Sequence, residues 1–338
     1  MDLREQRFGI EIEMTGITRA TASKVIAGYF HTSATHIGGG YDSYTVKDPE
    51  DRNWKIMRDS SIECTNRQGE RASQLYSVEF VSPICQYKDI ETLQELVRAL
   101  RNAGARVNGR CGIHVHVDAS KHTPKTLRNI VNIMASKEDL LYKALDVNVR
   151  REHYCEKADT RFLDEVNKRP PLTMEQIKDM WYDGEDGSWR HYDDTRYHGL
   201  NLHSVFSKGT IEFRLFNSTL HAGKVKAYVQ LSLAISHQAL IQKRAMCNKT
   251  HSSNEKYTFR TWLLRLGMIG DEFKTARTHL LKNLDGNIAW KDPAQAEKQK
   301  ERLEQRRYIE TMENNVEIES EPETAEQQED GSDFSMSM

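Results

Sequence analysis

The sequence has 338 residues, and its 48 lysines and arginines nearly balance 50 aspartates and glutamates. This length can bury one large core, alone or with an appendage, and the balanced charge argues against general nucleic acid or membrane binding. No apolar run approaches the ~18 residues that span a bilayer, and no secretory signal is visible. The five cysteines form no Cys-x-x-Cys pair, so we expect free thiols and a cytoplasmic protein.

The first predicted strand alternates apolar and acidic residues from Phe8 to Glu13. Side chains along a strand point alternately to opposite faces, so Glu11 and Glu13 share one face while Ile10 and Ile12 share the other. A helix is expected over 18–30, a loop from Gly38, and a strand over 53–57.

Three further segments repeat this alternation, over 78–81, 111–117 and 211–215. Their apolar residues can join the same core as Ile10 and Ile12, namely Ile113, Val115, Val117, Ile211, Phe213 and Leu215. Their polar residues then face the other way, namely Glu79, His114, His116, Glu212 and Arg214.

Helical patterns separate these strands. A stripe of apolar residues begins after Asp89, a second follows Thr123-Pro124, a capping box is formed by Thr173 with Gln176, and a long apolar helix covers 223–244. This order predicts an α+β fold, in which helices pack on the apolar face of a mostly antiparallel sheet.

The C-terminal part is expected to be helical and then unstructured. Short helices are predicted over 257–266 and 272–284, and a charged helix over 293–314. Acidic residues then accumulate without lysine or arginine, which favours a disordered, solubilising tail over a docking segment. We therefore predict a catalytic domain over 1–244, a helical extension over 245–314 and an acidic tail over 315–338.

The polar face of the predicted sheet carries carboxylates and imidazoles, the side chains that hold divalent metals. Taken singly, each pair has an ordinary explanation: a solvated Glu-x-Glu face, buried structural histidines, or an ion pair within one strand. Together, framed by apolar alternation in distant segments, they indicate one metal site. Arg214, beside Glu212, is suited to bind phosphate oxygens.

Seven short motifs occur in one order and carry a family resemblance. They are Phe-Gly-x-Glu-x-Glu from Phe8, Asp-x-Ser from Asp59, Glu-x-Val-Ser-Pro from Glu79, Cys-Gly-x-His-Val-His-Val from Cys111, Arg-Arg-x-x-Tyr-Cys from Arg150, Arg-Tyr-x-x-Leu-Asn from Arg196 and Thr-x-Glu-Phe-Arg-x-Phe from Thr210. Over residues 8–238 the chain resembles the amidoligase family, which belongs with glutamine synthetase and glutamate–cysteine ligase among the carboxylate–amine ligases.

The resemblance implies a curved antiparallel sheet like the catalytic domain of glutamine synthetase, with ATP and magnesium as cofactors. We also predict that manganese partly replaces magnesium, since both accept oxygen-rich octahedral sites. Such enzymes phosphorylate a carboxylate, and an amine then displaces phosphate from the acyl phosphate to form an amide.

The resemblance also implies a role for each motif residue. Glu13 and Glu79 resemble ligands of the metal near the acceptor carboxylate, and Glu11, His114 and Glu212 resemble ligands of the metal that bridges the ATP phosphates. His116 resembles a residue near those phosphates. Arg214 and Arg196 resemble the arginines that neutralise the transferred phosphoryl group.

Other residues leave alternatives open. Asp59 fits a contact to the amine or a turn residue, and Glu63 fits a further metal ligand or, better, an exposed strand end. Arg150 or Arg151 fits a clamp for a substrate carboxylate.

Two further features in this part of the chain have a functional and a structural reading. Cys155 could be a nucleophile with His153 as its base, but this catalytic role is the less favoured interpretation of the two residues. Three aromatic residues fit either the acceptor pocket or packing on the core, namely Trp189, Tyr192 and Tyr197.

Two other functions compete with the ligase. One is a metal-dependent hydrolase that uses the Glu/His cluster on water, and the other is a scaffold without activity. The sequence lacks a glycine-rich phosphate loop of either common kind. It identifies neither the carboxylate and amine substrates nor the oligomeric state.

Overall fold

An eight-stranded sheet organises the computed structural model, which describes residues 2–319, with only the backbone described at 293, 296, 310 and 313–319. The strands are β1 (Phe8–Met14), β2 (Ala34–Gly38), β3 (Ser43–Lys47), β4 (Asn53–Met57), β5 (Val78–Val81), β6 (Gly112–Asp118), β7 (Leu200–Asn201) and β8 (Thr210–Asn217). Their order is β2-β3-β4-β5-β1-β6-β8-β7, and every neighbouring pair is antiparallel.

The predicted core is confirmed. All eight apolar residues assigned to the inner face of β1, β6 and β8 are at most 1% exposed. Burying an aliphatic side chain of this size contributes about 1.5–3 kcal/mol. The sheet is therefore held to its helices through the face opposite the predicted site.

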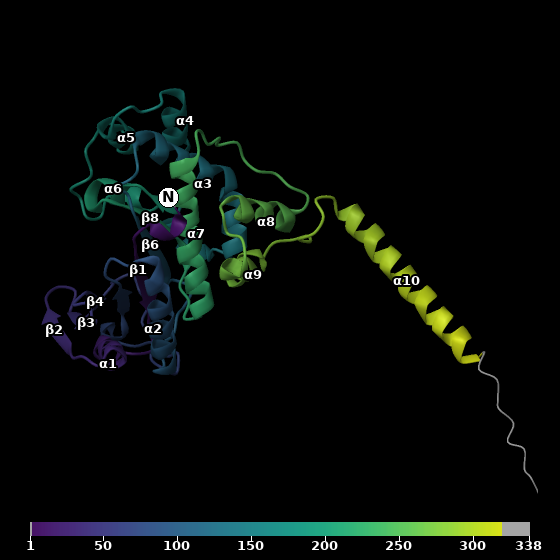
Figure 1. The fold of residues 1–338 in the computed structure, drawn as a ribbon. Helices are drawn as coiled ribbons and strands as arrows, with labels where there is room; N and C mark the ends of the chain where they lie inside the picture. Colours follow the sequence, from purple (N-terminus) through teal and green to yellow (C-terminus); the bar gives the residue numbers. More distant parts are fainter. Residues whose placement is uncertain (1, 320–338) are drawn as a thin grey trace, which may run out of the picture. The chain divides into compact units, whose positions relative to one another are not determined.

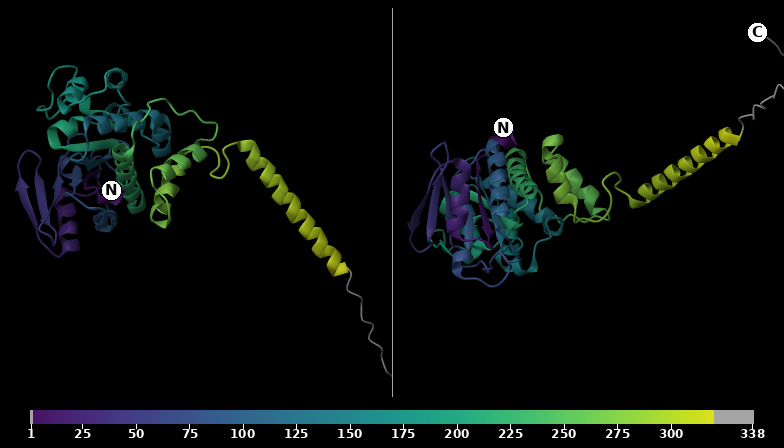
Figure 2. Two further views of the ribbon diagram at one scale, coloured as in Figure 1. Left: turned by 45° about the horizontal axis from the view of Figure 1, so that its top comes forward. Right: turned by 90° about the horizontal axis from the view of Figure 1, so that it is seen from below.

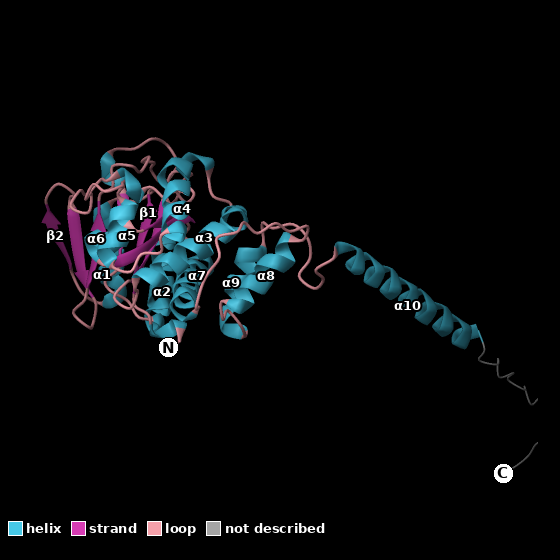
Figure 3. Ribbon diagram, turned by 90° about the horizontal axis from the view of Figure 1, so that it is seen from above, coloured by secondary structure: helices cyan, strands magenta, loops and turns pink. Residues whose placement is uncertain are grey.

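Helices cover that apolar face (Figures 1 and 3). Helix α7 contacts β1 and β6 and lies between α2 and α3, while α1 packs on β3 and β4. Helices α8 and α9 form a further layer, with α9 against α7 (Figure 2). The helices of this unit are α1 (Arg19–Phe30), α2 (Ile90–Asn102), α3 (Pro124–Leu145), α4 (Thr160–Lys168), α5 (Met174–Trp181), α6 (His203–Lys208), α7 (Ala222–Ile241), α8 (Glu255–Arg265) and α9 (Lys274–Leu281).

Predicted helix starts agree closely with the structure. Thr18 caps α1, Thr123 caps α3 with Pro124 in its first turn, and Thr173 with Gln176 forms the capping box of α5. The α+β class and the antiparallel sheet are confirmed.

Several elements were not predicted from the sequence. The segment from Gly38 is the turn of the hairpin β2–β3, where Gly38 and Gly39 have φ of 71° and 75°. Helix α4 was also missed.

Residues up to Ile288 form one compact unit, and helix α10 (Pro293–Glu319) belongs to a second unit. The predicted helix over 293–314 is therefore present and extends further. Of the predicted acidic tail, residues 320–338 lie outside the described part of the chain. Among the described residues, no helix combines the length and apolar character needed to cross a membrane.

Candidate functional site

Strand pairing brings the predicted polar residues together on one face. Glu11 of β1 lies opposite His114 of β6, and His116 lies opposite Glu212 of β8. On the other side of β1, Glu13 lies opposite Glu79 of β5. Cross-strand partners stand about 4.5–5.5 Å apart at Cβ, so residues from four strands meet at one place.

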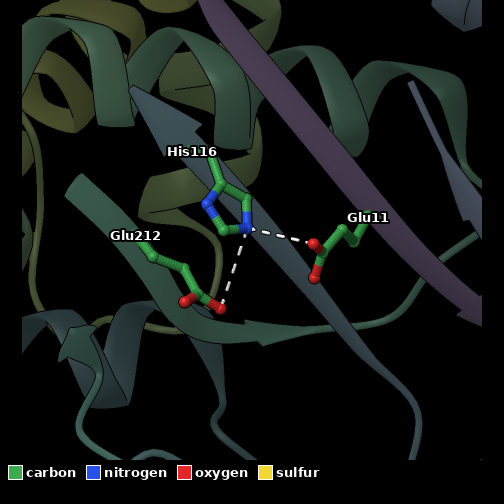
Figure 4. Close-up of side chains that lie close together, drawn as sticks. All are labelled: Glu11, His116 and Glu212. Carbon is green, nitrogen blue, oxygen red and sulfur yellow. Dashed lines mark ion pairs between the residues drawn. The ribbon is translucent and has the colours of Figure 1, made fainter. Parts of the chain in front are cut away.

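The first cluster consists of Glu11, His116 and Glu212, which can each place a ligand atom within 4.8 Å of the others. His116 Nε2 lies 3.2 Å from Glu11 Oε1 and 3.9 Å from Glu212 Oε1 (Figure 4). Two carboxylates and an imidazole arranged in this way suit a divalent cation.

The ring of His116 is oriented for such a role. Its Nδ1 lies 3.0 Å from Thr210 Oγ1, while its buried Nε2, which faces the carboxylates, has no hydrogen-bond partner among the described residues. The contact with Thr210 fixes one ring nitrogen of His116 and leaves the other free to bind a metal. Thr210 has this place because it precedes Glu212 by two positions on β8.

The second cluster consists of Glu13, Asp59 and Glu79, again with ligand atoms within 4.8 Å of one another. Glu13 is 5% exposed, and its Oε2 accepts a 2.7 Å hydrogen bond from the backbone N–H of Gly112. Asp59, which the sequence favoured as an amine contact or a turn residue, therefore stands with two predicted metal ligands.

His114 lies between the two clusters. Its Nδ1 is 3.1 Å from Glu11 Oε2 and 3.5 Å from Glu212 Oε1, and its Nε2 is 3.8 Å from Glu13 Oε1. Burial and the nearby Arg214 guanidinium lower the pKa of His114 to about 4. The ring is therefore neutral at pH 7 and able to act as a ligand.

The electrostatics of the two clusters differ. Burial and the charge of Asp59 raise the pKa of Glu13 to about 7, and burial with three neighbouring carboxylates raises the pKa of Glu79 well above its usual range. Burial would also raise the pKa of Glu11, but the imidazoles of His116 and His114 outweigh it and hold that pKa well below normal. Among the described residues, Arg151, Arg214 and Lys208 offset the repulsion in the second cluster only in part, so a divalent cation bound there would relieve it.

Glu212 is fixed by three partners. Its Oε2 accepts hydrogen bonds from Asn201 Nδ2 at 2.6 Å and Ser204 Oγ at 2.8 Å, and its Oε1 contacts Arg214 Nη1 at 2.6 Å. The guanidinium of Arg214 outweighs burial and holds the pKa of Glu212 below its usual range. Of these three partners, Arg214 was predicted from the sequence, Asn201 lies in one of the family motifs but had no predicted role, and Ser204 was not predicted.

Arg196, in the segment before β7, lines the cleft that covers the polar face of the sheet. Its guanidinium lies 5.6 Å from the ring centre of Tyr192 and 5.9 Å from that of Tyr197, and its Nη1 donates to the carbonyl of His191. Its buried Nε has no hydrogen-bond partner among the described residues. Arg196 and Arg214 therefore both line the cleft.

The two neighbouring arginines 150 and 151 differ sharply. Arg151 is 2% exposed and donates to the carbonyls of Phe216 and Arg214 at 2.7 and 2.8 Å, so it supports β8 from beside the cleft. Arg150 is exposed.

The cysteine that follows these arginines is buried. The thiol of Cys155 contacts the carbonyl of Arg151, and burial raises its pKa. The exposed ring of His153 lies 3.5 Å from Glu156 instead.

A cleft of about 610 Å³ covers the polar face and is lined by the whole second cluster, by Glu11 of the first, and by Arg196 and Arg214. Two further hollows adjoin it. One, of about 290 Å³, is polar and lies over Glu212 and Asn201, and the other, of about 390 Å³, is largely apolar and lies over Gly9 and His116. Both also border Lys208, the last residue of α6, which the sequence did not indicate.

Comparison with known proteins places the chain in a family. No curated protein matches the chain. Among solved structures, the chain is similar to a bifunctional glutathione synthetase from Pasteurella multocida, with 10% identity and a TM-score of 0.37 over 83% of this chain. The chain spans about half, 47%, of that protein. The sequence model of the family described as "Putative amidoligase enzyme" matches residues 4–236, so the chain belongs to the amidoligase family.

Proposed function

We propose that this protein is an ATP- and magnesium-dependent carboxylate–amine ligase that forms an amide through an acyl phosphate. The observation that carries the proposal is the pair of carboxylate clusters on one face of the sheet, with Arg214 and Arg196 beside them. Family membership supports the same class of reaction.

The proposed reaction has two steps. A carboxylate oxygen of the acceptor attacks the γ-phosphorus of ATP, and ADP leaves. The amine nitrogen then attacks the acyl carbon, its proton passes to a base, and inorganic phosphate leaves with the C–O bond electrons. Phosphoryl transfer of this kind depends mainly on positioning and charge neutralisation.

The two clusters would hold the metal ions. We assign Glu11, Glu212 and the Nε2 of His116 to the ion that binds the nucleotide phosphates, with His114 as a neighbour that reaches both sites. We assign Glu13 and Glu79, with Asp59 as a third ligand, to the ion near the acceptor carboxylate. Bound magnesium would polarise phosphate and carboxylate oxygens, and manganese would partly replace it because both accept oxygen-rich octahedral sites.

The protein's own cations have complementary tasks. Arg214 and Arg196 would orient the transferred phosphoryl group and neutralise charge that develops on its oxygens. The buried, partnerless Nε of Arg196 supports this, because a buried N–H without an acceptor is costly unless a ligand satisfies it.

The apolar hollow is the best place for the nucleoside. It adjoins the first cluster at Glu11 and His116, and its walls include Val81, Pro83 and Ile84. Gly9 forms part of the polar face without a side chain, so an aromatic base can lie close to the backbone there. The acceptor would then occupy the larger cleft beside the second cluster.

Other parts of the proposal concern the whole chain. We propose that the sheet is of the glutamine synthetase type and that residues 1–244 hold the catalytic site, since no residue lining the three cavities follows Arg214. Residues 245–314 would be an extension and 315–338 an acidic tail. The five unpaired cysteines support work in the reducing cytoplasm.

Phosphorus NMR of the purified protein with Mg-ATP, with and without pooled amino acids and polyamines, tests this function. We expect substrate-stimulated ADP and phosphate, lost in Glu212→Gln. AMP and pyrophosphate would indicate adenylation and overturn the mechanism. Turnover that needs no nucleotide would favour a hydrolase instead.

A further inference from the structure

Three cations at the mouth of the large cleft lack firm carboxylate partners. Lys55 and Arg58 form no ion pair or side-chain hydrogen bond within residues 2–319, and Arg110 reaches only the exposed Glu63, at 3.7 Å. Lys55 pairs with Val81 and Met57 with Glu79, so Lys55 stands on the polar face close to the second cluster. These three residues are called the rim cations below.

Arginines elsewhere in the same region are paired. Arg19 contacts Asp42. Arg52, the residue before β4, contacts Asp48 at 2.8 Å and Asp89 at 2.9 Å. Lys55 and Arg58 have no such partner within residues 2–319, and Arg110 has only a 3.7 Å contact with exposed Glu63, so the rim cations differ from these structural arginines. A cation left without a partner beside a cleft is available to a ligand.

The charge balance of the cleft points to an anionic acceptor. Seven lysines and arginines line it, against four carboxylates, which are Glu11, Glu13, Asp59 and Glu79. All four belong to the proposed metal clusters, so bound cations would leave them no charge to balance the rim. The rim cations are assigned neither to the nucleotide nor to the metal clusters, so the positive potential that they add to the cleft favours and steers a negatively charged substrate.

The size of the cleft points to an acceptor larger than a free amino acid. Its volume is about 610 Å³, and pockets of ~300–1,000 Å³ hold drug-sized ligands. Four tyrosines line it, and two of them, Tyr41 and Tyr192, bring their hydroxyl groups to 3.5 Å from each other across 151 positions of sequence. Aromatic walls with interspersed cations suit an extended peptide.

We propose that the acceptor is a short acidic peptide, whose reacting carboxylate lies at the second cluster while its further carboxylates bind the rim cations. This inference rests on the proposed function and specifies the substrate class of the same site. The rim cations would fix the peptide by charge-assisted hydrogen bonds and take no part in the chemical step.

Calorimetry with defined probes tests the proposal. Triglutamate, in α-linked and γ-linked forms, is compared with triglutamine and with free glutamate, in magnesium with a non-hydrolysable ATP analogue. The variants are Lys55→Gln and Arg58→Gln. Matched controls are Lys24→Gln and Arg101→Gln, which are exposed on α1 and α2 on the opposite side of the sheet.

We expect one form of triglutamate to bind at least about fivefold tighter than triglutamine and free glutamate. Lys55→Gln and Arg58→Gln should each weaken it by about fivefold, as expected for exposed ion pairs, while the controls bind like the original protein. Equal binding of the three probes, no binding of either triglutamate, or equal effects of rim and control substitutions would overturn the inference.

A separate readout distinguishes this failure from failure of the proposed function. Manganese binding, followed by electron paramagnetic resonance, reports the clusters without any acceptor. Normal manganese binding in Lys55→Gln and Arg58→Gln would show that both variants fold and retain the metal sites. If the original protein itself does not bind manganese, the proposed function is contradicted instead.

Discussion

Arg214 Nη1 lies 2.6 Å from Glu212 Oε1, and both residues project from β8 to the same face. The same oxygen lies 3.5 Å from His114 and 3.9 Å from His116. The guanidinium therefore contacts the carboxylate oxygen that faces the first cluster, where a metal ion would also bind. Because both residues are nearly fully buried, this pair is unlike a solvated ion pair on a strand surface.

Replacing Glu212 with glutamine should remove both metal affinity and turnover. The change deletes one ligand charge and leaves Arg214 buried without its partner. We expect at least about a 100-fold loss of ADP formation, as for other lost electrostatic contacts, and weaker manganese binding by titration. Glu95→Gln, on the exposed side of α2, is the control. Normal manganese affinity in Glu212→Gln would contradict the assignment of the first cluster.

Replacing Glu79 with glutamine should stabilise the protein without metal. The substitution removes repulsion from Glu11, Asp59 and Glu13, and the gain should be on the order of 1 kcal/mol. In EDTA the melting temperature of Glu79→Gln should exceed that of the original protein. Magnesium should raise the melting temperature of Glu79→Gln by less than it raises that of the original protein. A lower melting temperature in EDTA would argue against repulsion at the second cluster.

Stability without metal should fall between pH 6.5 and 8. The pKa of Glu13 is raised to about 7 and that of His116 is raised as well. The folded state therefore binds these protons more firmly than the unfolded chain does, and it releases them over this pH range. Stability gained by binding those protons is present at lower pH and is lost as pH rises. His114, whose pKa is lowered, acts only below about pH 6.5.

Metal affinity should change in the opposite direction over the same range, because metal and protons compete for the same groups. Manganese titration and thermal denaturation in EDTA, both at pH 6.5 and 8, check the two trends. Glu13→Gln should flatten them. Affinity independent of pH would count against Glu13 as a ligand.

Arg151→Met should destabilise the fold, whereas Arg150→Met should not. The buried guanidinium of Arg151 donates to two carbonyls of β8, and its loss removes both hydrogen bonds, at a cost of about 1–3 kcal/mol each. Chemical denaturation measures the difference. If Arg150→Met raises the KM for an acceptor while stability is unchanged, Arg150 contacts substrate after all.

Gly9→Val should weaken nucleotide binding while the protein still folds. A Cβ at Gly9 would meet only His116 Cβ and Ser82 Oγ, both at 3.9 Å, and valine is favoured in strands. The larger side chain would fill the apolar hollow, and we expect at least about a tenfold loss of affinity for an ATP analogue. Gly9→Ala should have a smaller effect. Unchanged affinity in Gly9→Val would place the nucleoside elsewhere.

The sequence predicted which residues share a face because the period of two is a local property of a strand. It could not predict which strands become neighbours, and the site depends on that. Asp59 illustrates what the sequence cannot predict. The segment Asp59-Ser60-Ser61 suits a turn, whereas the proximity of Asp59 to Glu13 arises only because β4 and β1 flank β5.

Other residues of the candidate site were missed for a related reason. Ser204 and Lys208 lie on the short helix α6, where nothing in the local pattern separates them from ordinary polar residues. They reach Glu212 and Glu11 because α6 connects β7 to β8. The hairpin β2–β3 was missed because its three consecutive glycines suggest a flexible loop, and only its pairing with β4 reveals the strands.

The central position of β1 has a consequence for how the protein is made. Its partners β5 and β6 follow it at a distance, and Glu212 is synthesised roughly 200 residues after Glu11, on the order of 10–40 seconds at ~5–20 residues per second. Until then the ribosome holds a nascent chain with Glu11 and Glu13 but no completed sheet. If the first cluster binds a metal ion as proposed, it can do so only after translation has passed β8, and a chain truncated before β8 would lack this site.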